Sequence, residues 1–356
     1  MKKERITYDS VGISTGKDKT KMSGIGEYLK TDDKNVLNGL GPFASLYDFN
    51  ARAKELGISD PLLVLKMEEP GTKQLLAARH GYSESIGHDV VNHIVNDIAV
   101  MGGIPFALLD CVVRGSELDE STLELVKGFS DACKNNGMSL VGGEVSIQPD
   151  MMAKDVYVLS AALAGMVDRK NVIDGSKMKP GDKILAVAAN GLHTNGYTLA
   201  RKLMDIDPTL AETKIDGETY LSHIMKPHIT YFPAIKDLLD KDMITGMAHI
   251  TGGGMAGNLA RIIGDKVSAE IDLTKLEILP LFLEIQKRSN NLETDMLKTF
   301  NCGVGLLIVM PEKYEDKISE HISKFHKCYR IGEITEKKEK PVIYKGETIW
   351  KKNEQN

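Results

Sequence analysis

Three acidic side chains have positions from which they could bind a metal ion. Glu68 follows an apolar run at 61–67, Glu144 follows a shorter run at 138–141 and two glycines, and Asp97 lies on a predicted helix. Carboxylates that converge repel one another unless a cation joins them. Oxygen ligands with open coordination positions suit Mg²⁺ bound through nucleotide phosphates. Taken singly, each of these acids is more typical of an ordinary surface position.

Residues 85–103 are predicted to form an amphipathic helix whose polar face is unusual. Ser85 can cap its start, and Gly102 and Gly103 can end it. At 100° per residue, Val90, Val91, Ile94, Val95 and Ile98 share one arc. The opposite arc carries Asp89, Asn92, His93, Asn96 and Asp97. Such a face is either a solvated surface that lacks long side chains or part of a site, and the helix alone does not decide between them.

Two glycine-rich turns open predicted helices in the second half of the chain. Backbone N–H groups at a helix start bind anions well, and glycine lets the anion approach closely. The triple glycine is the more specific signal, because an ordinary helix start needs one capping residue. A GxxxxGK[ST] motif is absent, so a P-loop is excluded. The candidate ligand-contacting residues are His193, Asn195, Gly196, His249, Thr251, Gly252, Gly253 and Gly254.

A third glycine-containing segment runs from Gly39 to Phe49. Gly39, Gly41 and Ala44 match a loose dinucleotide fingerprint, but no convincing strand precedes them and Pro42 interrupts them. The segment is therefore either a plain turn or a flexible loop over a nucleotide. Two other residues favour structural roles: His93 is typical of a hydrogen-bonded structural group, and Cys302 is expected to be a small core residue within a strand.

The order of predicted elements indicates an α/β or α+β protein of two domains. Apolar runs typical of strands alternate with helical patterns in both halves. The strands are expected at 61–67, 104–113, 138–141, 156–167, 183–189, 300–310 and 342–344. The helices are expected at 121–136, 191–204, 247–263, 280–288 and 314–327, where the second and third include the glycine turns. A polar, turn-rich stretch at 168–182 predicts a domain junction, which divides the chain into 1–168 and 169–356.

The composition excludes several classes of protein. The chain has 356 residues, 42% hydrophobic and 27% charged, with a formal net charge of −5. A negative net charge gives no electrostatic support for a nucleic-acid or anionic-membrane partner. The four cysteines are widely spaced, which favours free thiols in a reducing compartment. We expect a cytoplasmic protein, because no signal peptide or apolar run of membrane-spanning length is found.

The motifs and their order together resemble one enzyme family, the aminoimidazole ribonucleotide synthetases, which are phosphoribosylformylglycinamidine cyclo-ligases. The similarity runs from about residue 8 to 332. The blocks that carry it are GLGPFASLYDF, GHDVVNHIVNDIAVMGGIPFALLD, IDGSKMKPGD, GLHTNGYTLARK, HITGGGMAGNLAR and FNCGVG.

The resemblance implies a fold and a reaction. The expected fold has an N-terminal sheet domain that binds ATP and metal and forms a homodimer, and a C-terminal α/β domain that binds the substrate phosphate. The expected enzyme is an ATP-dependent carbon–nitrogen ligase of purine biosynthesis. It would activate the formyl-amide oxygen of formylglycinamidine ribonucleotide as a phosphate ester before the imidazole ring closes.

The resemblance also implies roles for the candidate residues. Mg²⁺ would bind Glu68, Asp97 and Glu144, and Lys73 would join Asp97 and Glu144 in the catalytic set. Helix N-termini in the second domain would hold the ribonucleotide phosphate. The residues expected to contact ATP are Gly39, Gly41, Phe43, Asn96 and Asp97, with 39–43 as a lid.

Two segments depart from the family pattern and keep alternatives open. Glu68-Glu69-Pro70 stands where the family usually has Asp-Gly-Val, and Val145 and Ile147 replace a threonine and a glutamate. One alternative is a divergent member of the superfamily that phosphorylates or ligates another small phosphorylated substrate. The other is a non-catalytic nucleotide-binding homologue.

Overall fold

The computed structural model describes residues 5–7, 10, 24–38, 42–239 and 241–350. The chain divides into two compact units, which are 1–95 with 105–166 (unit 1) and 96–104 with 167–356 (unit 2). Residues 96–104, expected in the first domain, therefore group with unit 2. The physical reason is a set of contacts within unit 2: the Asn96 amide bonds to the backbone of Ile229 and Tyr231, and Met101 accepts a hydrogen bond from the Ile173 amide.

Unit 1 is built on a four-stranded sheet in the order β1-β4-β2-β3. Its strands are β1 (Pro61–Glu68), β2 (Ile104–Arg114), β3 (Ser139–Ile147) and β4 (Tyr157–Asp168). Its helices are α2 (Phe49–Glu55), α3 (Lys73–His80), α4 (Ser83–Ala99, the last turn of which groups with unit 2) and α5 (Glu120–Asn135). β2 and β3 run parallel, with Asp110 opposite Gly143.

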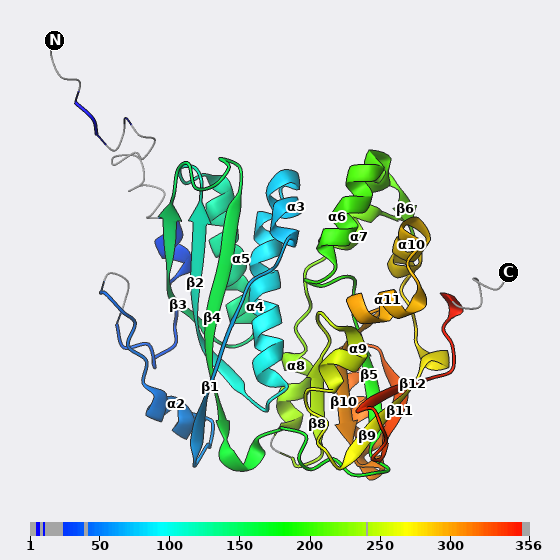
Figure 1. The fold of residues 1–356 in the computed structure, drawn as a ribbon. Coiled ribbons are helices and arrows are strands. Elements are labelled where there is room, and N and C mark those ends of the chain that lie inside the picture. The colour runs from blue at the N-terminus through cyan, green and yellow to red at the C-terminus, as the bar shows by residue number, and fades with distance from the viewer. Residues whose placement is uncertain (1–4, 8–9, 11–23, 39–41, 240, 351–356) are drawn as a thin grey trace. The chain divides into compact units, whose positions relative to one another are not determined.

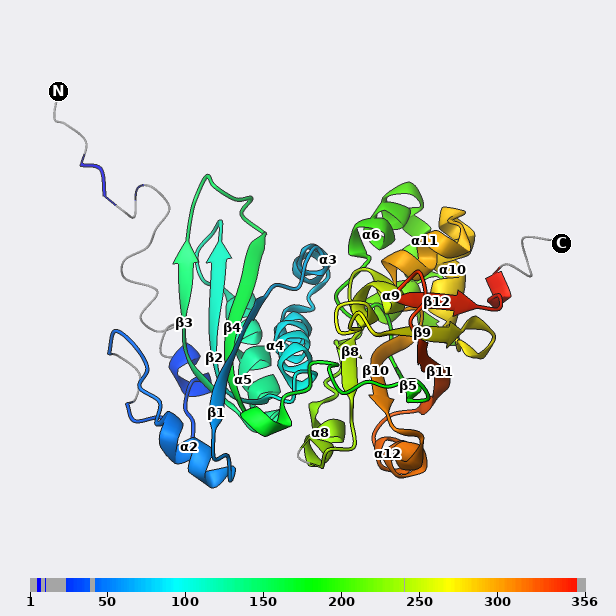
Figure 2. The same cartoon turned by 60° about the horizontal axis from the view of Figure 1, so that its bottom comes forward.

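Helices α4 and α5 lie side by side on one face of this sheet, as Figures 1 and 2 show. The helices cross closely because each has a glycine at the contact: a Cβ on Gly87 would meet the Leu125 carbonyl oxygen at 2.7 Å, and one on Gly128 would overlap the Glu84 carbonyl. The apolar arc expected on α4 is buried from Val90 to Ile98. The helix therefore packs its apolar side as its pattern predicted.

Asp110 on β2 is a buried acid, 7% exposed, whose pKa is raised to about 7 by burial. The folded chain thus binds this proton more tightly than the unfolded chain, in which a carboxyl titrates near pH 4. The free energy of unfolding should fall as pH rises from about 4 to 7 and stay low above that range.

We expect Asp110→Asn to remove this pH dependence and to stabilise the protein at pH 8. The pKa rises from near 4 to about 7, which is about three tenfold steps in proton affinity. Each step corresponds to about 1.4 kcal/mol, so the gain is on the order of 4 kcal/mol at most. Urea unfolding at pH 5 and pH 8 measures it. If the free energy of unfolding changed by the same amount between pH 5 and pH 8 in the variant and in the parent, the assignment would be contradicted.

Unit 2 contains a six-stranded sheet in the order β12-β9-β11-β5-β10-β8. β5 at its centre pairs antiparallel with β10 and β11, whereas β12 pairs parallel with β9. The strands are β5 (Lys183–Ala188), β8 (Gly246–His249), β9 (Val267–Asp272), β10 (Val304–Met310), β11 (Cys328–Glu336) and β12 (Val342–Lys345), with β6 (Lys214–Ile215) and β7 (Glu218–Thr219) as a separate pair. All seven residues of β10 are buried. The centre of this sheet is thus the core of the unit.

The helices of unit 2 pack around this sheet, and α9 and α12 contact its strands directly. Their bounds are α6 (Tyr197–Ile206), α7 (Tyr220–Met225), α8 (Phe232–Ile235), α9 (Gly254–Leu259), α10 (Pro280–Ser289), α11 (Glu293–Thr299) and α12 (Glu315–Ile322). Short 3₁₀ turns lie at Arg169–Asn171, Pro208–Glu212, Lys236–Leu238, Leu273–Lys275 and Glu312–Tyr314.

The two-domain α/β prediction is confirmed, and the departures are local. β3 continues through Ile147, so Glu144 lies within the strand and does not follow it. Cys302 is buried, as expected of a small core residue, but it lies in the turn before β10 with φ of 54°. β9 and β11 were not predicted, and β8 occupies the start of the segment 247–263 that was expected to form a glycine turn and helix. No helix among the described residues is long and apolar enough to cross a membrane.

Candidate functional site

The polar face of α4 is buried rather than solvated, so the solvated-surface alternative is wrong. Asp89, Asn92, His93 and Asn96 are each no more than 8% exposed. Burying polar groups is costly unless they are paired, and α4 pairs them through side chains from distant segments. Asn136, for example, donates to the Asn92 side chain at 3.2 Å. The face is therefore an organised polar interior.

Lys73 forms a buried ion pair at the start of α3. Its Nζ lies 2.8 Å from each carboxylate oxygen of Asp89 on α4, and both side chains are fully buried. Burial lowers the pKa of Lys73, and the Asp89 carboxylate opposes that effect. The lysine was predicted to belong to the catalytic set; the structure pairs its charge with Asp89.

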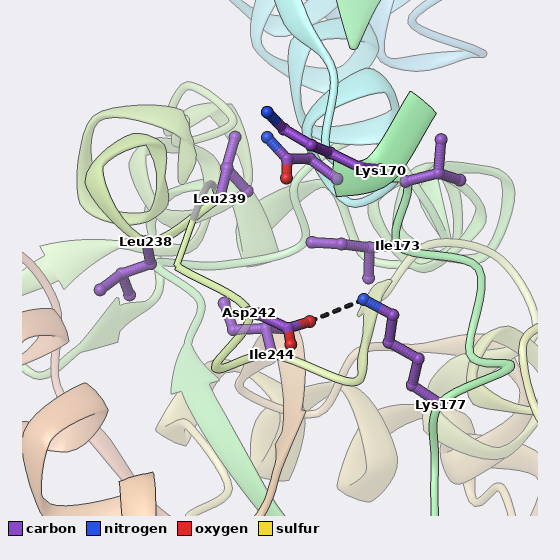
Figure 3. Close-up of a pocket in the computed structure, with 9 residues that line it drawn as sticks. Lys170, Ile173, Lys177, Leu238, Leu239, Asp242 and Ile244 are labelled. Carbon is purple, nitrogen blue, oxygen red and sulfur yellow. Dashed lines mark hydrogen bonds and ion pairs between the residues drawn. The ribbon is translucent and has the colours of Figure 1, made fainter. Parts of the chain in front are cut away.

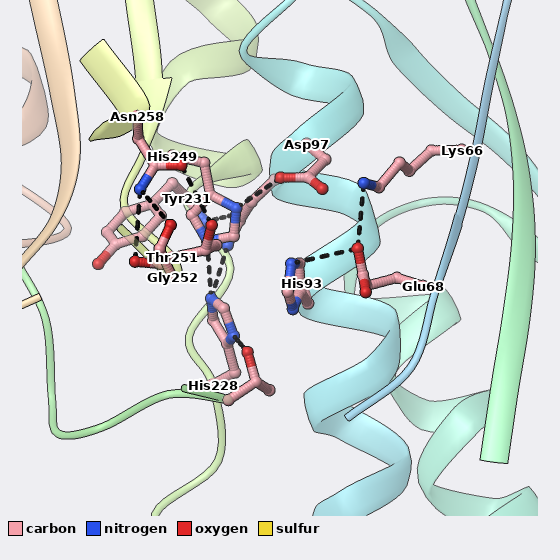
Figure 4. Close-up of polar contacts among 12 residues, drawn as sticks. Lys66, Glu68, His93, Asp97, His228, Tyr231, His249, Thr251, Gly252 and Asn258 are labelled. Carbon is pink, nitrogen blue, oxygen red and sulfur yellow. Dashed lines mark hydrogen bonds and ion pairs between the residues drawn. The ribbon is translucent and has the colours of Figure 1, made fainter. Parts of the chain in front are cut away.

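The two predicted metal ligands of unit 1 are not brought together. Glu68 ends β1 and Glu144 lies exposed on β3, and these are the two edge strands of the sheet. Three strand spacings of about 4.8 Å separate them, so they do not fit a single ion within this unit. Glu68 contacts Lys66 at 3.0 Å and His93 at 3.8 Å (Figure 4).

In unit 2, Asp97 pairs with a histidine predicted for the site. Its Oδ1 lies 2.7 Å from Nδ1 of His249, which ends β8 (Figure 4). The other ring nitrogen of His249, Nε2, lies 3.0 Å from Nε2 of His228. His228 in turn stacks on His193, with ring centroids 4.1 Å apart. Two histidines predicted separately from the two glycine turns thus meet through a third.

His228 is a site residue that the sequence prediction missed. It lies in the connection between α7 and α8, where no motif or periodicity marks it. Asn96 holds this connection: its Oδ1 accepts a hydrogen bond from the Tyr231 amide at 2.8 Å, and its Nδ2 donates to the Ile229 carbonyl at 3.0 Å. Asn96 was predicted to contact ATP; the structure gives it a role in holding residues 228–231.

The two glycine turns lie against each other in unit 2. A Cβ on Gly252 would lie 3.2 Å from Oδ1 of Asn195, so the two turns approach each other closely at this point. Asn258 on α9 ties back the second turn, because its Nδ2 donates to the carbonyls of Thr251, Gly252 and Gly254 (Figure 4). Gly252 and Gly253 are exposed, and among the described residues their amides make no hydrogen bond. The turn therefore presents backbone donors to a ligand.

The FNCG block, residues 300–303, packs against the first glycine turn, residues 193–196. The side chain of Asn301 donates to the Gly191 carbonyl at 2.9 Å. Gly196 caps α6 with φ of 83°, and a Cβ there would overlap the Phe300 ring. His193 also has a left-handed backbone, with φ of 60°, which is uncommon outside glycine and occurs often at binding sites. The two glycine turns and the FNCG block are thus in contact with one another.

The remaining predicted residues contribute less. Gly39 and Gly41 lie outside the described residues, and Phe43 is fully exposed. Two cavities lie away from the predicted residues. One of about 320 Å³ in unit 2 lies between residues 170–177 and 238–244, where Lys177 and Asp242 form an ion pair (Figure 3). Another, of about 610 Å³ in unit 1, lies beside residues 28–35 and 137–140.

Comparison with known sequences identifies relatives over most of the chain. Family models for the N-terminal and C-terminal domains of AIR synthase related proteins match residues 59–167 and 179–345. Phosphoribosylformylglycinamidine cyclo-ligase of Streptococcus pneumoniae (strain P1031) is 32% identical over 318 residues, which is 89% of this chain and 92% of the relative. The enzyme of Streptococcus agalactiae serotype Ia is 32% identical over 317 residues, with the same coverage.

Comparison with solved structures shows the same fold in more distant proteins. HypE of E. coli superposes with a TM-score of 0.67 at 18% identity, covering 92% of this chain and 94% of HypE. A HypE structure in complex with ATP gives 0.66 at 16% identity, with 93% and 92% covered. Thiamine-monophosphate kinase of Stenotrophomonas maltophilia gives 0.63 at 18% identity, with 89% and 93% covered.

Proposed function

The chain belongs to the phosphoribosylformylglycinamidine cyclo-ligase family, and we propose how its residues serve the ATP-dependent ring closure of that family. As a member, it is a carbon–nitrogen ligase of purine biosynthesis. A phosphoryl group passes from ATP to the formyl-amide oxygen of formylglycinamidine ribonucleotide. An internal nitrogen then attacks the carbon bonded to that oxygen, and phosphate leaves as the imidazole ring closes. The relatives do not support the two alternatives, a divergent kinase or ligase and a non-catalytic homologue.

The proposal for the substrate site rests on the second glycine turn of unit 2, residues 251–254. We assign the ribonucleotide phosphate to the amides of Gly252 and Gly253, two exposed residues of the turn whose carbonyls Asn258 holds. Preorganised backbone donors bind a phosphate without further rearrangement. Asn195 and His193 come from the neighbouring turn, and His249 lies two residues before Thr251. This assignment is supported by the contacts that bring the turn at 193–196, the turn at 251–254 and the FNCG block at 300–303 together in unit 2.

We propose ATP with Mg²⁺ as the cosubstrate. Support for nucleotide use comes from the similarity of the fold to HypE, which has been solved in complex with ATP. Magnesium would supply charge neutralisation of the phosphates, with Glu68, Asp97 and Glu144 as candidate oxygen ligands. Because Glu68 and Glu144 lie on opposite sheet edges, one ion within one copy of unit 1 takes at most one of them. Lys73 and Asn96 would act by holding Asp89 and segment 228–231 in place.

We also propose a homodimer through the sheet of unit 1, in the cytoplasm. Leu63, Leu65 and Met67 alternate along β1 and are 55%, 69% and 65% exposed, and Leu109 of β2 is 48% exposed. An apolar sheet face of this kind marks an interaction surface. Leu65→Lys should halve the mass found by light scattering. Leu292→Lys, at a 60% exposed leucine of unit 2, should leave it unchanged. A monomeric parent protein would contradict the dimer.

The reaction is tested by ADP release from the purified protein with Mg²⁺-ATP, with and without formylglycinamidine ribonucleotide. We expect ADP release to depend on the ribonucleotide and to match formation of aminoimidazole ribonucleotide in equal amounts. The control is the same assay with ATP replaced by a non-hydrolysable analogue. ATP binding without ribonucleotide-dependent turnover would overturn the assignment of the substrate.

A further inference from the structure

Tyr344 on β12 contacts the helix that follows the second glycine turn. Its hydroxyl oxygen accepts a hydrogen bond at 3.1 Å from the amide of Ala256, which lies in the first turn of α9. β12 lies beside α9 in Figure 2, and the two elements are in contact. The strand fixes the tyrosine, because β12 pairs with β9 and Tyr344 lies opposite Ile271. The start of α9 is thus tied to the sheet of unit 2.

This hydrogen bond replaces one that would extend the helix into the turn. In an α-helix, the Ala256 amide would donate to the carbonyl four residues earlier, that of Gly252. Here the amide donates to Tyr344, and the Gly252 carbonyl accepts from Nδ2 of Asn258 at 3.2 Å. Helical bonding begins at the next amide, that of Gly257. Tyr344 and Asn258 together therefore keep Gly252 outside the helix.

The second glycine turn needs support from its surroundings. Gly253 and Gly254 have φ of 99° and 63°, and glycine passes readily between this region and the helical one. α11 restricts one side, because a Cβ on Gly254 would overlap the Leu297 carbonyl. Asn258 acts from within α9, whereas Tyr344 acts from the sheet. The conformation of residues 251–254 therefore depends on these contacts more than on its own backbone preference.

The Tyr344 hydroxyl accepts the amide without adding charge. Burial raises the pKa of Tyr344 to about 12, so the hydroxyl stays neutral at ordinary assay pH. Aspartate is a common acceptor for amides at a helix start, but its carboxylate would repel a phosphate bound at the turn. A neutral acceptor avoids that repulsion. Tyrosine therefore suits a turn that binds an anion.

We propose that Tyr344 is a positioning residue for the ribonucleotide: its hydroxyl holds the turn 251–254 in the conformation whose Gly252 and Gly253 amides bind the phosphate. The phosphate rests on the proposed function, whereas the support of the turn by Tyr344 does not. This phosphate does not react when the ring closes, so we expect its contacts to be the same in the ground state and the transition state. Loss of such binding raises KM and leaves kcat unchanged.

The test compares Tyr344→Phe with Tyr329→Phe. Tyr329 on β11 is a matched control, because its hydroxyl accepts the amide of Glu277 at 3.2 Å and burial also raises its pKa to about 12. Both variants keep the aromatic ring and lose one acceptor of a backbone amide. We therefore expect a similar loss of stability in urea unfolding, and circular dichroism checks that both variants fold. Of the two, Tyr344→Phe alone releases the start of α9.

Hydrogen exchange of the ligand-free protein measures the support of the turn. Mass spectrometry of peptides that contain residues 252–257 should show exchange about 3–10-fold faster in Tyr344→Phe than in the parent protein, as expected for the loss of one ordinary hydrogen bond. Tyr329→Phe should leave these peptides unchanged and speed exchange near residue 277. This measurement needs no substrate, so its result is independent of the proposed function.

Steady-state kinetics measures the consequence for the ribonucleotide. Tyr344→Phe should raise KM for formylglycinamidine ribonucleotide by about 3–10-fold, with kcat and KM for ATP unchanged, and Tyr329→Phe should change none of them. Unchanged exchange at 252–257 in Tyr344→Phe would overturn the proposal, and so would an unchanged KM or an equal rise of KM in Tyr329→Phe. A parent protein without ribonucleotide-dependent turnover would contradict the proposed function instead, and hydrogen exchange would still decide the role of Tyr344.

Discussion

Replacing Asp97 by asparagine should lower ribonucleotide-dependent turnover by at least about 10²-fold. Two properties of the carboxylate lead to this expectation. Its Oδ1 accepts the Nδ1 proton of His249 at 2.7 Å, and we propose it as an oxygen ligand of the ATP-bound Mg²⁺. An asparagine keeps the shape of the side chain but loses the charge. The measurement is steady-state ADP release with saturating formylglycinamidine ribonucleotide.

The dependence of turnover on Mg²⁺ separates the two properties. If Asp97 is a metal ligand, excess Mg²⁺ should restore part of the activity of the variant. If Asp97 acts by orienting His249, kcat should stay low at every Mg²⁺ concentration. Glu84→Gln is the control, because Glu84 lies on the same helix and pairs with Lys127 at a half-exposed position. Unchanged turnover in Asp97→Asn would remove this carboxylate from the site.

Helix α4 shows what its sequence pattern could predict and what it could not. The apolar arc was predicted correctly because it depends only on the period of the helix. The burial of the polar arc was not predictable in the same way. It depends on side chains that are distant in sequence, such as Lys73 beside Asp89 and Asn136 beside Asn92. A helical pattern shows which residues share a face, but not what covers that face.

The missed elements have a similar explanation. β9 carries Glu270 inside the sheet, 7% exposed, which breaks the apolar pattern expected of a buried strand. Its charge is balanced by Lys338 and Lys345, which lie more than sixty residues later. His228 was missed because its importance comes from His249 and Asn96, and none of its sequence neighbours indicates them. The glycine turns were found because their chemistry is local.

Lys73→Met should lower the free energy of unfolding by about 3–5 kcal/mol. The substitution keeps most of the apolar stem of the side chain but leaves the Asp89 carboxylate buried without its cation. An uncompensated charge in the interior keeps its full desolvation cost. Urea unfolding at constant pH measures the change, and the slope of the transition should stay the same if the variant keeps the native fold.

A second variant and a surface pair identify the cause. Lys73→Met combined with Asp89→Asn removes both charges, so it should recover much of the stability lost in the single variant. Lys30→Met breaks an exposed pair with Glu27, whose side chains are 69% and 68% exposed, and should change stability by about 1 kcal/mol or less. If the double variant were no more stable than Lys73→Met, the loss would come from packing around the lysine stem. The Lys73–Asp89 pair would then not be the electrostatic support of α3 on α4.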